Sequence, residues 1–236
     1  MPFLYPDNSL FSMKKVYLLL VLLVATMGVM RFLPGLFSPS EKNAEVVGDG
    51  FKDGDLIFQT SLSAQSMAIQ LATHSSYSHC GILFKEDGEW WVFEAVQPVG
   101  RCRLKDWARR GKENVFVVKR LKQDAMLTKQ VLDSMRSIAG TWFRRDYDPF
   151  FEWSDDRLYC SELIWKLYER TTGLQIGELQ QLQDLDLSAP QVQEIMYARY
   201  KNNPPLTEKL ITPVAMFRSP LLQTVFARGE WITSSH

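Results

Sequence analysis

The pattern of apolar and polar positions is most informative in the run YSHCGILFKEDGEWWVFEAV, which spans residues 77–96. Two stretches rich in β-branched and aromatic residues flank Asp87-Gly88, a dipeptide that is typical of a tight hairpin turn. A turn at that dipeptide places Gly81 opposite Glu94, and His79 lies two residues before Gly81. The pattern therefore predicts an antiparallel hairpin whose register is set by its turn.

One face of this hairpin carries two candidate catalytic residues. Because side chains alternate between the faces of a strand, His79 and Glu94 become diagonal neighbours, and Gly81 leaves space for the carboxylate to lean toward the imidazole. A carboxylate that holds one ring nitrogen leaves the other nitrogen as a base. Cys80 points to the opposite face, where we expect it in the core. A single histidine on a strand is more often structural, but this pairing favours a catalytic role.

A second pattern, at the spacing of a helix, begins at Cys160. We expect Asp155, Asp156 or Ser161 to cap its start and Gly173 to end it. A single free cysteine on an apolar stripe is most often a core residue. The positive end of a helix, however, favours a thiolate, so Cys160 is a candidate nucleophile. The predicted apolar stripe is Cys160, Leu163, Ile164, Leu167 and Tyr168, and the rest of the surface carries Glu162, Lys166, Glu169 and Arg170.

The other predicted elements are shorter or less regular. Composition and periodicity predict strands at residues 54–58 and 115–121, and helices at 62–72, 125–139 and 190–201. The chain is long enough for one domain with a sizeable core, and we expect that domain to span residues 51–236.

The N-terminal region has the pattern of an export signal. Two lysines after Met13 precede a largely apolar run that ends at Met30. We therefore expect residues 1–37 to be a signal peptide or a membrane anchor, and residues 38–50 a linker. Translation from Met13 would give the more usual short charged region. The expected location is the periplasm, or the outer face of the inner membrane if the segment is an anchor.

Composition excludes several classes of function. The formal net charge is zero and no long basic run appears, which argues against nucleic acid as a partner. The three cysteines form no CxxC pair, and no glycine-rich phosphate loop or cluster of metal ligands occurs. We therefore expect neither a cofactor nor a metal ion.

Few residues compete for the catalytic roles. The histidines are His74, in a polar loop, His79, and the terminal His236, so His79 is the strongest candidate for a base. Among the thiols, Cys102 is the competitor of Cys160, because Arg101 and Arg103 flank Cys102 and are expected to activate it modestly.

The order His79, Glu94, Cys160 and the motifs around these residues resemble a known family. The stretches GDLIFQ (54–59), SHCGI (78–82), VFEAV (92–96) and WSDDRLYCSELIWKLY (153–168) resemble YiiX-like members of the circularly permuted papain-like amidases, which are related to NlpC-type cell-wall peptidases. This resemblance implies an α+β, circularly permuted papain-like (NlpC-type) fold, in which an antiparallel sheet packs against helices. It also implies that Tyr147 helps to bind the oxyanion, although a half-buried aromatic residue is the more common role for its type.

We therefore expect a hydrolase that works through a Cys160–His79–Glu94 triad and an acyl-enzyme. The expected substrate is an amide bond in a cell-wall peptide. One alternative is a lipid-directed thioesterase or acyltransferase with the same triad, and another is a binding module without catalysis.

Overall fold

The computed structural model describes residues 50–229. The predicted signal or anchor at 1–37, nearly all of the predicted linker at 38–50, and the C-terminal residues 230–236 lie outside the described part. Within residues 50–229, no helix is both long enough and apolar enough to cross a membrane.

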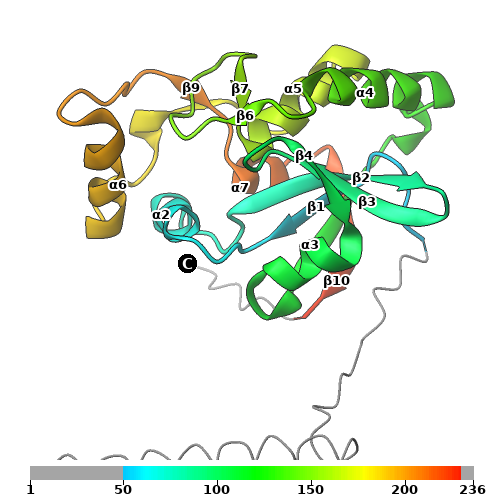
Figure 1. The fold of residues 1–236 in the computed structure, drawn as a ribbon, viewed down its shortest axis with the longest axis horizontal. Helices are drawn as coiled ribbons and strands as arrows, with labels where there is room; N and C mark the ends of the chain where they lie inside the picture. Colours follow the sequence, from blue (N-terminus) through cyan, green and yellow to red (C-terminus); the bar gives the residue numbers. More distant parts are fainter. Residues whose placement is uncertain (1–49, 230–236) are drawn as a thin grey trace, which may run out of the picture. The chain divides into compact units, whose positions relative to one another are not determined.

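Six strands form one antiparallel sheet in the order β10-β5-β1-β2-β3-β4 (Figure 1). The predicted hairpin is confirmed, with Glu86 opposite Glu89 and Ile82 opposite Phe93, and its turn residues Asp87 and Gly88 both have positive φ. The strands are β1 (Leu56–Gln59), β2 (His79–Glu86), β3 (Glu89–Glu94), β4 (Gly100–Arg103), β5 (Phe116–Leu121) and β10 (Leu222–Arg228).

Helices cover both faces of this sheet. Figure 1 shows α4 (Lys129–Trp142) and α5 (Cys160–Thr172) on one face and α3 (Leu104–Arg110) on the other. The largest apolar cluster lies between the sheet and α5, and it joins alternate residues of β1 and β2, such as Phe58 and Ile82, to Leu163. This arrangement confirms the predicted α+β class, with an antiparallel sheet packed against helices.

Two further helices lie beside the sheet. Helices α2 (Ala64–Thr73) and α6 (Pro190–Tyr200) pack against each other through Ala68, Ala72 and Val192 (Figure 1). The shorter elements are β6 (Asp146–Tyr147), β7 (Arg157–Leu158), β8 (Gln180–Gln181), β9 (Lys209–Leu210), α7 (Pro213–Phe217) and the 3₁₀ turns Lys112–Asn114, Asp124–Met126 and Leu182–Asp184.

Most predicted elements are present with shifted ends. The helix expected at 125–139 starts later, because Asp124–Met126 forms a 3₁₀ turn and the Thr128 hydroxyl accepts the Val131 N–H as a cap. The strand expected at 115–121 is β5, and the helix expected at 190–201 is α6. Helix α3 and strand β10 were not predicted from the sequence.

The expectation that Glu162 and Lys166 lie on a solvated face of α5 is wrong. Both residues are buried, because the loop before the helix covers the side that faces away from the sheet. Lys166 Nζ donates to Glu162 Oε1 at 2.7 Å, to the Ser154 carbonyl at 2.6 Å and to Asp155 Oδ1 at 3.0 Å. The buried ammonium ties this loop to α5.

The start of α5 also differs from the expected capping. Asp155 binds Lys166, and the Ser161 hydroxyl donates to the Ile211 carbonyl at 2.7 Å, so neither side chain caps the helix. Instead, Glu162 Oε2 accepts the backbone N–H of Tyr159 at 3.3 Å. The predicted end is confirmed, since Gly173 takes the left-handed conformation after Thr172 (φ 72°).

Candidate active site

Cys160 is the first residue of α5, and strand β7 leads the chain into this position. The residue is 4% exposed. Its thiol interacts with the imidazole of His79 and with the thiol of Cys80, which stands next to His79 on β2. The structure therefore joins the helix start to the strand that carries the predicted base.

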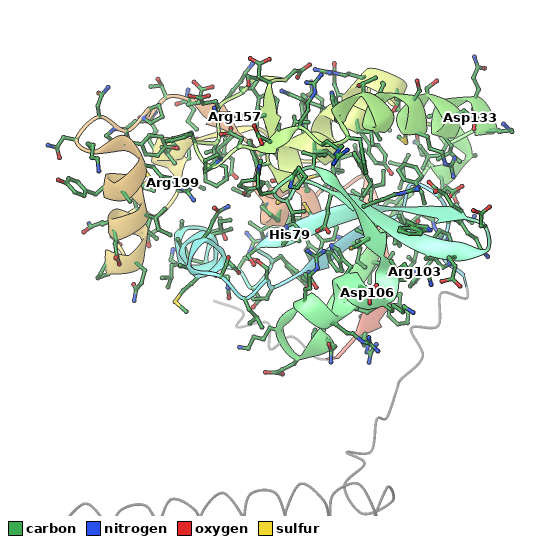
Figure 2. All side chains as sticks on the ribbon, in the orientation of Figure 1. His79, Arg103, Asp106, Asp133, Arg157 and Arg199 are labelled. Atoms are coloured by element: carbon green, nitrogen blue, oxygen red, sulfur yellow. The ribbon has the colours of Figure 1, made fainter. Side chains whose placement is uncertain are left out.

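His79 also contacts Glu94, as the hairpin register predicts. Its Nε2 atom lies 2.6 Å from Glu94 Oε2, and Figure 2 labels His79 in the middle of the domain. Since Nε2 binds the carboxylate, Nδ1 is the nitrogen left for the thiol of Cys160. The imidazole thus bridges the carboxylate and the thiol.

The expected role of Gly81 needs a correction. A Cβ atom at this position would lie 2.3 Å from Cγ1 of Val92. The space that the glycine leaves is therefore occupied by Val92. Glu94 contacts His79 but does not use this space.

The charges of the three groups support an ion pair. Burial alone would lower the pKa of His79, but the Cys160 thiolate and Glu94 raise that pKa to about 10. The hydrogen bond from Cys80 lowers the pKa of Cys160 well below its usual value; burial opposes this and His79 reinforces it. Between these two pKa values the pair exists as thiolate and imidazolium.

Two residues that were not predicted from the sequence hold Glu94. Trp107 Nε1 donates to Glu94 Oε2 at 2.9 Å, and Arg110 Nη2 donates to Glu94 Oε1. Burial opposes ionisation of Glu94, but His79 and Arg110 lower its pKa. Trp107 and Arg110 are three residues apart, hence on one face of α3, and that spacing is the signal in the sequence.

The expectation that Arg101 and Arg103 activate Cys102 is wrong. Cys102 lies opposite Val92 on β4 and points to Glu94 Oε1, at 3.3 Å. Burial and the Glu94 carboxylate raise the pKa of Cys102 to about 12. Arg101 and Arg103 point to the other face, where their guanidinium carbons lie 4.7 and 5.7 Å from the ring centre of Trp91.

His74, the weaker candidate for the base, takes no part in this cluster. It ends α2 in the left-handed conformation and its Nε2 lies 3.0 Å from Asp186 Oδ2. Its side chain is 73% exposed. The third histidine, His236, lies outside the described residues.

Tyr147 is brought close to Cys160 by a pair of short parallel strands. It lies opposite Leu158, two residues before the cysteine. Burial raises the pKa of Tyr147, and the thiolate of Cys160 raises it further. Its hydroxyl accepts a hydrogen bond from Gln65 on α2. All four candidate residues, Cys160, His79, Glu94 and Tyr147, therefore gather at one place.

An apolar cavity opens beside Cys160. It is bounded by α2, α6 and the segment around β9, and among the described residues that line it Arg199 is the only Lys, Arg, Asp or Glu. Figure 2 labels Arg199 on α6. The aliphatic residues of the lining include Ala68, Ile69, Val192, Ile195, Met196 and Leu210.

A cysteine at a helix start beside a histidine that a third side chain orients is the arrangement of papain-like proteins, in which that side chain is an Asn; here it is Glu94. Here the strands of the histidine and the carboxylate precede the cysteine helix in the chain. The chain belongs to the family of permuted papain-like amidase enzymes, YaeF/YiiX, C92, whose pattern matches residues 50–226.

Two relatives from Escherichia coli are similar to most of the chain. Uncharacterized protein YiiX of strain K12 is 45% identical over 178 residues, which cover 75% of this chain and 86% of that protein. The crystal structure of metalloprotein yiiX from strain O157:H7 has a TM-score of 0.72 and 44% identity, and the match covers 75% of this chain and 97% of that chain.

The yiiX protein of that crystal structure is described as a metalloprotein. Among residues 50–229 of this chain, no group of three or more His, Cys, Asp or Glu side chains is arranged to hold a metal ion. The described residues therefore do not fit such an ion.

Proposed function

We propose that this chain is a thiol hydrolase that cleaves an amide bond through an acyl-enzyme on Cys160. The observation that carries the proposal is the imidazole of His79, which contacts the Cys160 thiol and, through Nε2, binds Glu94 at 2.6 Å. A nucleophile, a base and a group that orients the base are thereby joined in one row.

The reaction follows from this row. The thiolate of Cys160 attacks the carbonyl carbon, and the oxyanion is bound by the Cys160 backbone N–H at the helix start, with the Tyr147 hydroxyl as a second donor. The imidazolium of His79 gives its proton to the leaving nitrogen as the C–N bond breaks. His79 then takes a proton from water, whose oxygen attacks the thioester, and the carboxylic acid leaves as the thiolate is restored. Glu94 keeps the ring oriented throughout.

For the substrate we propose a cell-wall peptide. The resemblance to NlpC-type peptidases and the export pattern at residues 1–37 support this choice. The same pattern supports a periplasmic or membrane-anchored enzyme. Residues 1–50 can be fused to a reporter that is active only after export, and we expect the fusion to be active. A fusion that stays inactive in the cytoplasm would contradict the proposed periplasmic or membrane-anchored location.

A second candidate is an acyl ester or thioester. The aliphatic cavity beside Cys160 supports it, because it matches an alkyl chain better than the polar acyl part of a cell-wall peptide. The chemistry at Cys160 is the same, with an alcohol or thiol as the leaving group.

The test compares the two classes directly. Purified protein is incubated with isolated muropeptides and, separately, with a phospholipid and an octanoyl thioester, and the products are identified by mass spectrometry. Cys160→Ser is expected to abolish turnover. His79→Ala is expected to lower it by about 10²–10⁴-fold, the usual contribution of acid–base catalysis.

His74→Ala is the matched control, because His74 is exposed and pairs with Asp186. It is expected to retain full activity, and circular dichroism checks that every variant is folded. Normal turnover by Cys160→Ser would contradict the proposal. Absence of turnover and of any acyl-enzyme with both substrate classes would favour the binding module.

A further inference from the structure

Three polar side chains form a hydrogen-bonded row beside Cys160. Arg199 Nη2, on α6, donates to Gln65 Oε1, on α2, at 2.6 Å. Gln65 Nε2 then donates to the hydroxyl of Tyr147 on β6. Arg199, Gln65 and Cys160 line the same cavity. The row therefore ends on the tyrosine that was proposed to bind the oxyanion.

The chemistry of arginine sets the direction of each bond in the row. A guanidinium has five N–H donors and no acceptor, so the amide oxygen of Gln65 must face Arg199. The NH₂ group of the Gln65 amide must then face Tyr147, and the tyrosine oxygen accepts its hydrogen bond. The hydrogen of the Tyr147 hydroxyl is consequently not directed at Gln65, and it remains available to donate to another oxygen.

Arg199 is itself held in place. Its guanidinium carbon lies 5.3 Å from the ring centre of Phe151, and α6 is anchored on α2 through Val192 and Ala68. Burial and the nearby thiolate raise the pKa of Tyr147, so its hydroxyl keeps its hydrogen at neutral pH.

We propose that Gln65 and Arg199 are positioning residues that direct the Tyr147 hydroxyl hydrogen toward the carbonyl oxygen of the substrate. Arg199 fixes the amide of Gln65, and the amide fixes the hydroxyl before Cys160 attacks. A donor oriented in advance stabilises the developing oxyanion without reorganisation during the reaction. The inference rests on the proposed thiol hydrolase function and names how that site binds the oxyanion.

Gln65→Glu tests this orientation with a side chain of the same size. The new carboxylate keeps the pair with Arg199, but it has no N–H group and accepts the hydrogen of Tyr147 instead. The probe is p-nitrophenyl acetate, which transfers its acetyl group to the Cys160 sulfur as the C–O bond to p-nitrophenolate breaks. We expect Gln65→Glu and Tyr147→Phe each to slow this transfer by about 100-fold, the usual loss for one oxyanion donor.

Two further measurements separate positioning from damage to the fold. The double variant Gln65→Glu/Tyr147→Phe is expected to be no slower than Tyr147→Phe, since both changes remove the same donor. Alkylation of Cys160 by iodoacetamide is expected to keep its rate in both single variants, because that reaction forms no oxyanion. Gln193→Glu, on the exposed side of α6, is the charge control and is expected to transfer acetyl at the normal rate.

Different outcomes overturn different parts. If Tyr147→Phe is slow but Gln65→Glu transfers acetyl at the normal rate, Gln65 does not orient the hydroxyl. If Tyr147→Phe itself keeps the normal rate, the row has no role in oxyanion binding, while the proposal for Cys160 stands. If wild-type Cys160 takes up no acetyl group at all, the proposed function fails, and the inference fails with it.

Discussion

Arg110 donates a hydrogen bond to Glu94 Oε1, while Oε2 of the same carboxylate binds His79. The carboxylate must be ionised to keep the imidazole oriented. Burial works against ionisation, and the charges of His79 and Arg110 overcome it and lower the pKa of Glu94. The contribution of Arg110 should therefore appear in the pH dependence of turnover.

Replacement of Arg110 by Met is expected to raise the pKa of Glu94. Because activity needs the carboxylate form, the acidic limb of the pH–rate profile should move to higher pH, with a larger loss of turnover at acidic than at neutral pH. Arg109→Met is the matched control, since Arg109 is 64% exposed and its closest ion pair, with Asp106, is 4.0 Å long. An Arg110→Met profile that superimposes on that of Arg109→Met would contradict this role.

At this scale the sequence predicted the pair His79 and Glu94, because a tight turn sets the register of two adjacent strands. It did not predict Trp107 and Arg110, whose contact with Glu94 depends on how α3 folds back over the sheet. The expected activation of Cys102 by its neighbouring arginines was wrong, because adjacent residues of a strand point to opposite faces.

Helix α5 is the element on which the site depends, and its first half is buried on all sides. The ammonium of Lys166 is buried with Glu162, and it joins the helix to the loop at Ser154 and Asp155. Burial raises the pKa of Glu162 to about 8 although Lys166 lowers it, so the ammonium acts here as a hydrogen-bond donor to three oxygens. Its removal leaves buried acceptors without a donor.

We expect Lys166→Met to lower the free energy of unfolding by about 3 kcal/mol, because the Ser154 carbonyl and Glu162 lose a buried donor. Lys129→Met is the control from another helix, because Lys129 pairs with Asp133 at the same i,i+4 spacing but is 89% exposed, and it should change the stability little. Urea unfolding of the two variants measures the difference. Equal stability of the two variants would show that the buried pair contributes no more than an exposed one.

Elements with strong local signals were predicted from the sequence, and elements without them were not. The turn at Asp87-Gly88 and the glycine at 173 mark their elements locally. The burial of Lys166 has no such signal, because it depends on a loop that folds over the far side of α5. Strand β10 was missed because its pairing with β5 joins residues about a hundred positions apart.

At the scale of the whole molecule, the order of His79, Glu94 and Cys160 indicated the permuted fold, and the family match agrees with it. The cavity beside Cys160 was not predicted, because α2 and α6, which are far apart in the chain, form it together. Its aliphatic lining bears on which substrate class the molecule accepts.

If an alkyl chain occupies this cavity, p-nitrophenyl octanoate should be cleaved with a higher kcat/KM than the acetate ester. Met196→Glu places a charge in the lining and is expected to reduce that preference by about tenfold or more. Gln193→Glu, exposed on the same helix, should leave the preference unchanged. A wild-type protein with no preference for the longer ester would contradict the acyl candidate and leave the peptide candidate.

The central claim is that Cys160 is a thiolate paired with His79, and alkylation of the three cysteines tests it most directly. The pKa of Cys160 is lowered, whereas burial raises the pKa of Cys80 well above its usual value and that of Cys102 to about 12. At mildly acidic pH we expect iodoacetamide to label Cys160 first, as mass spectrometry of the digested protein would show, and we expect His79→Ala to remove this preference. Labelling of Cys80 or Cys102 before Cys160, or an unchanged preference in His79→Ala, would contradict the account.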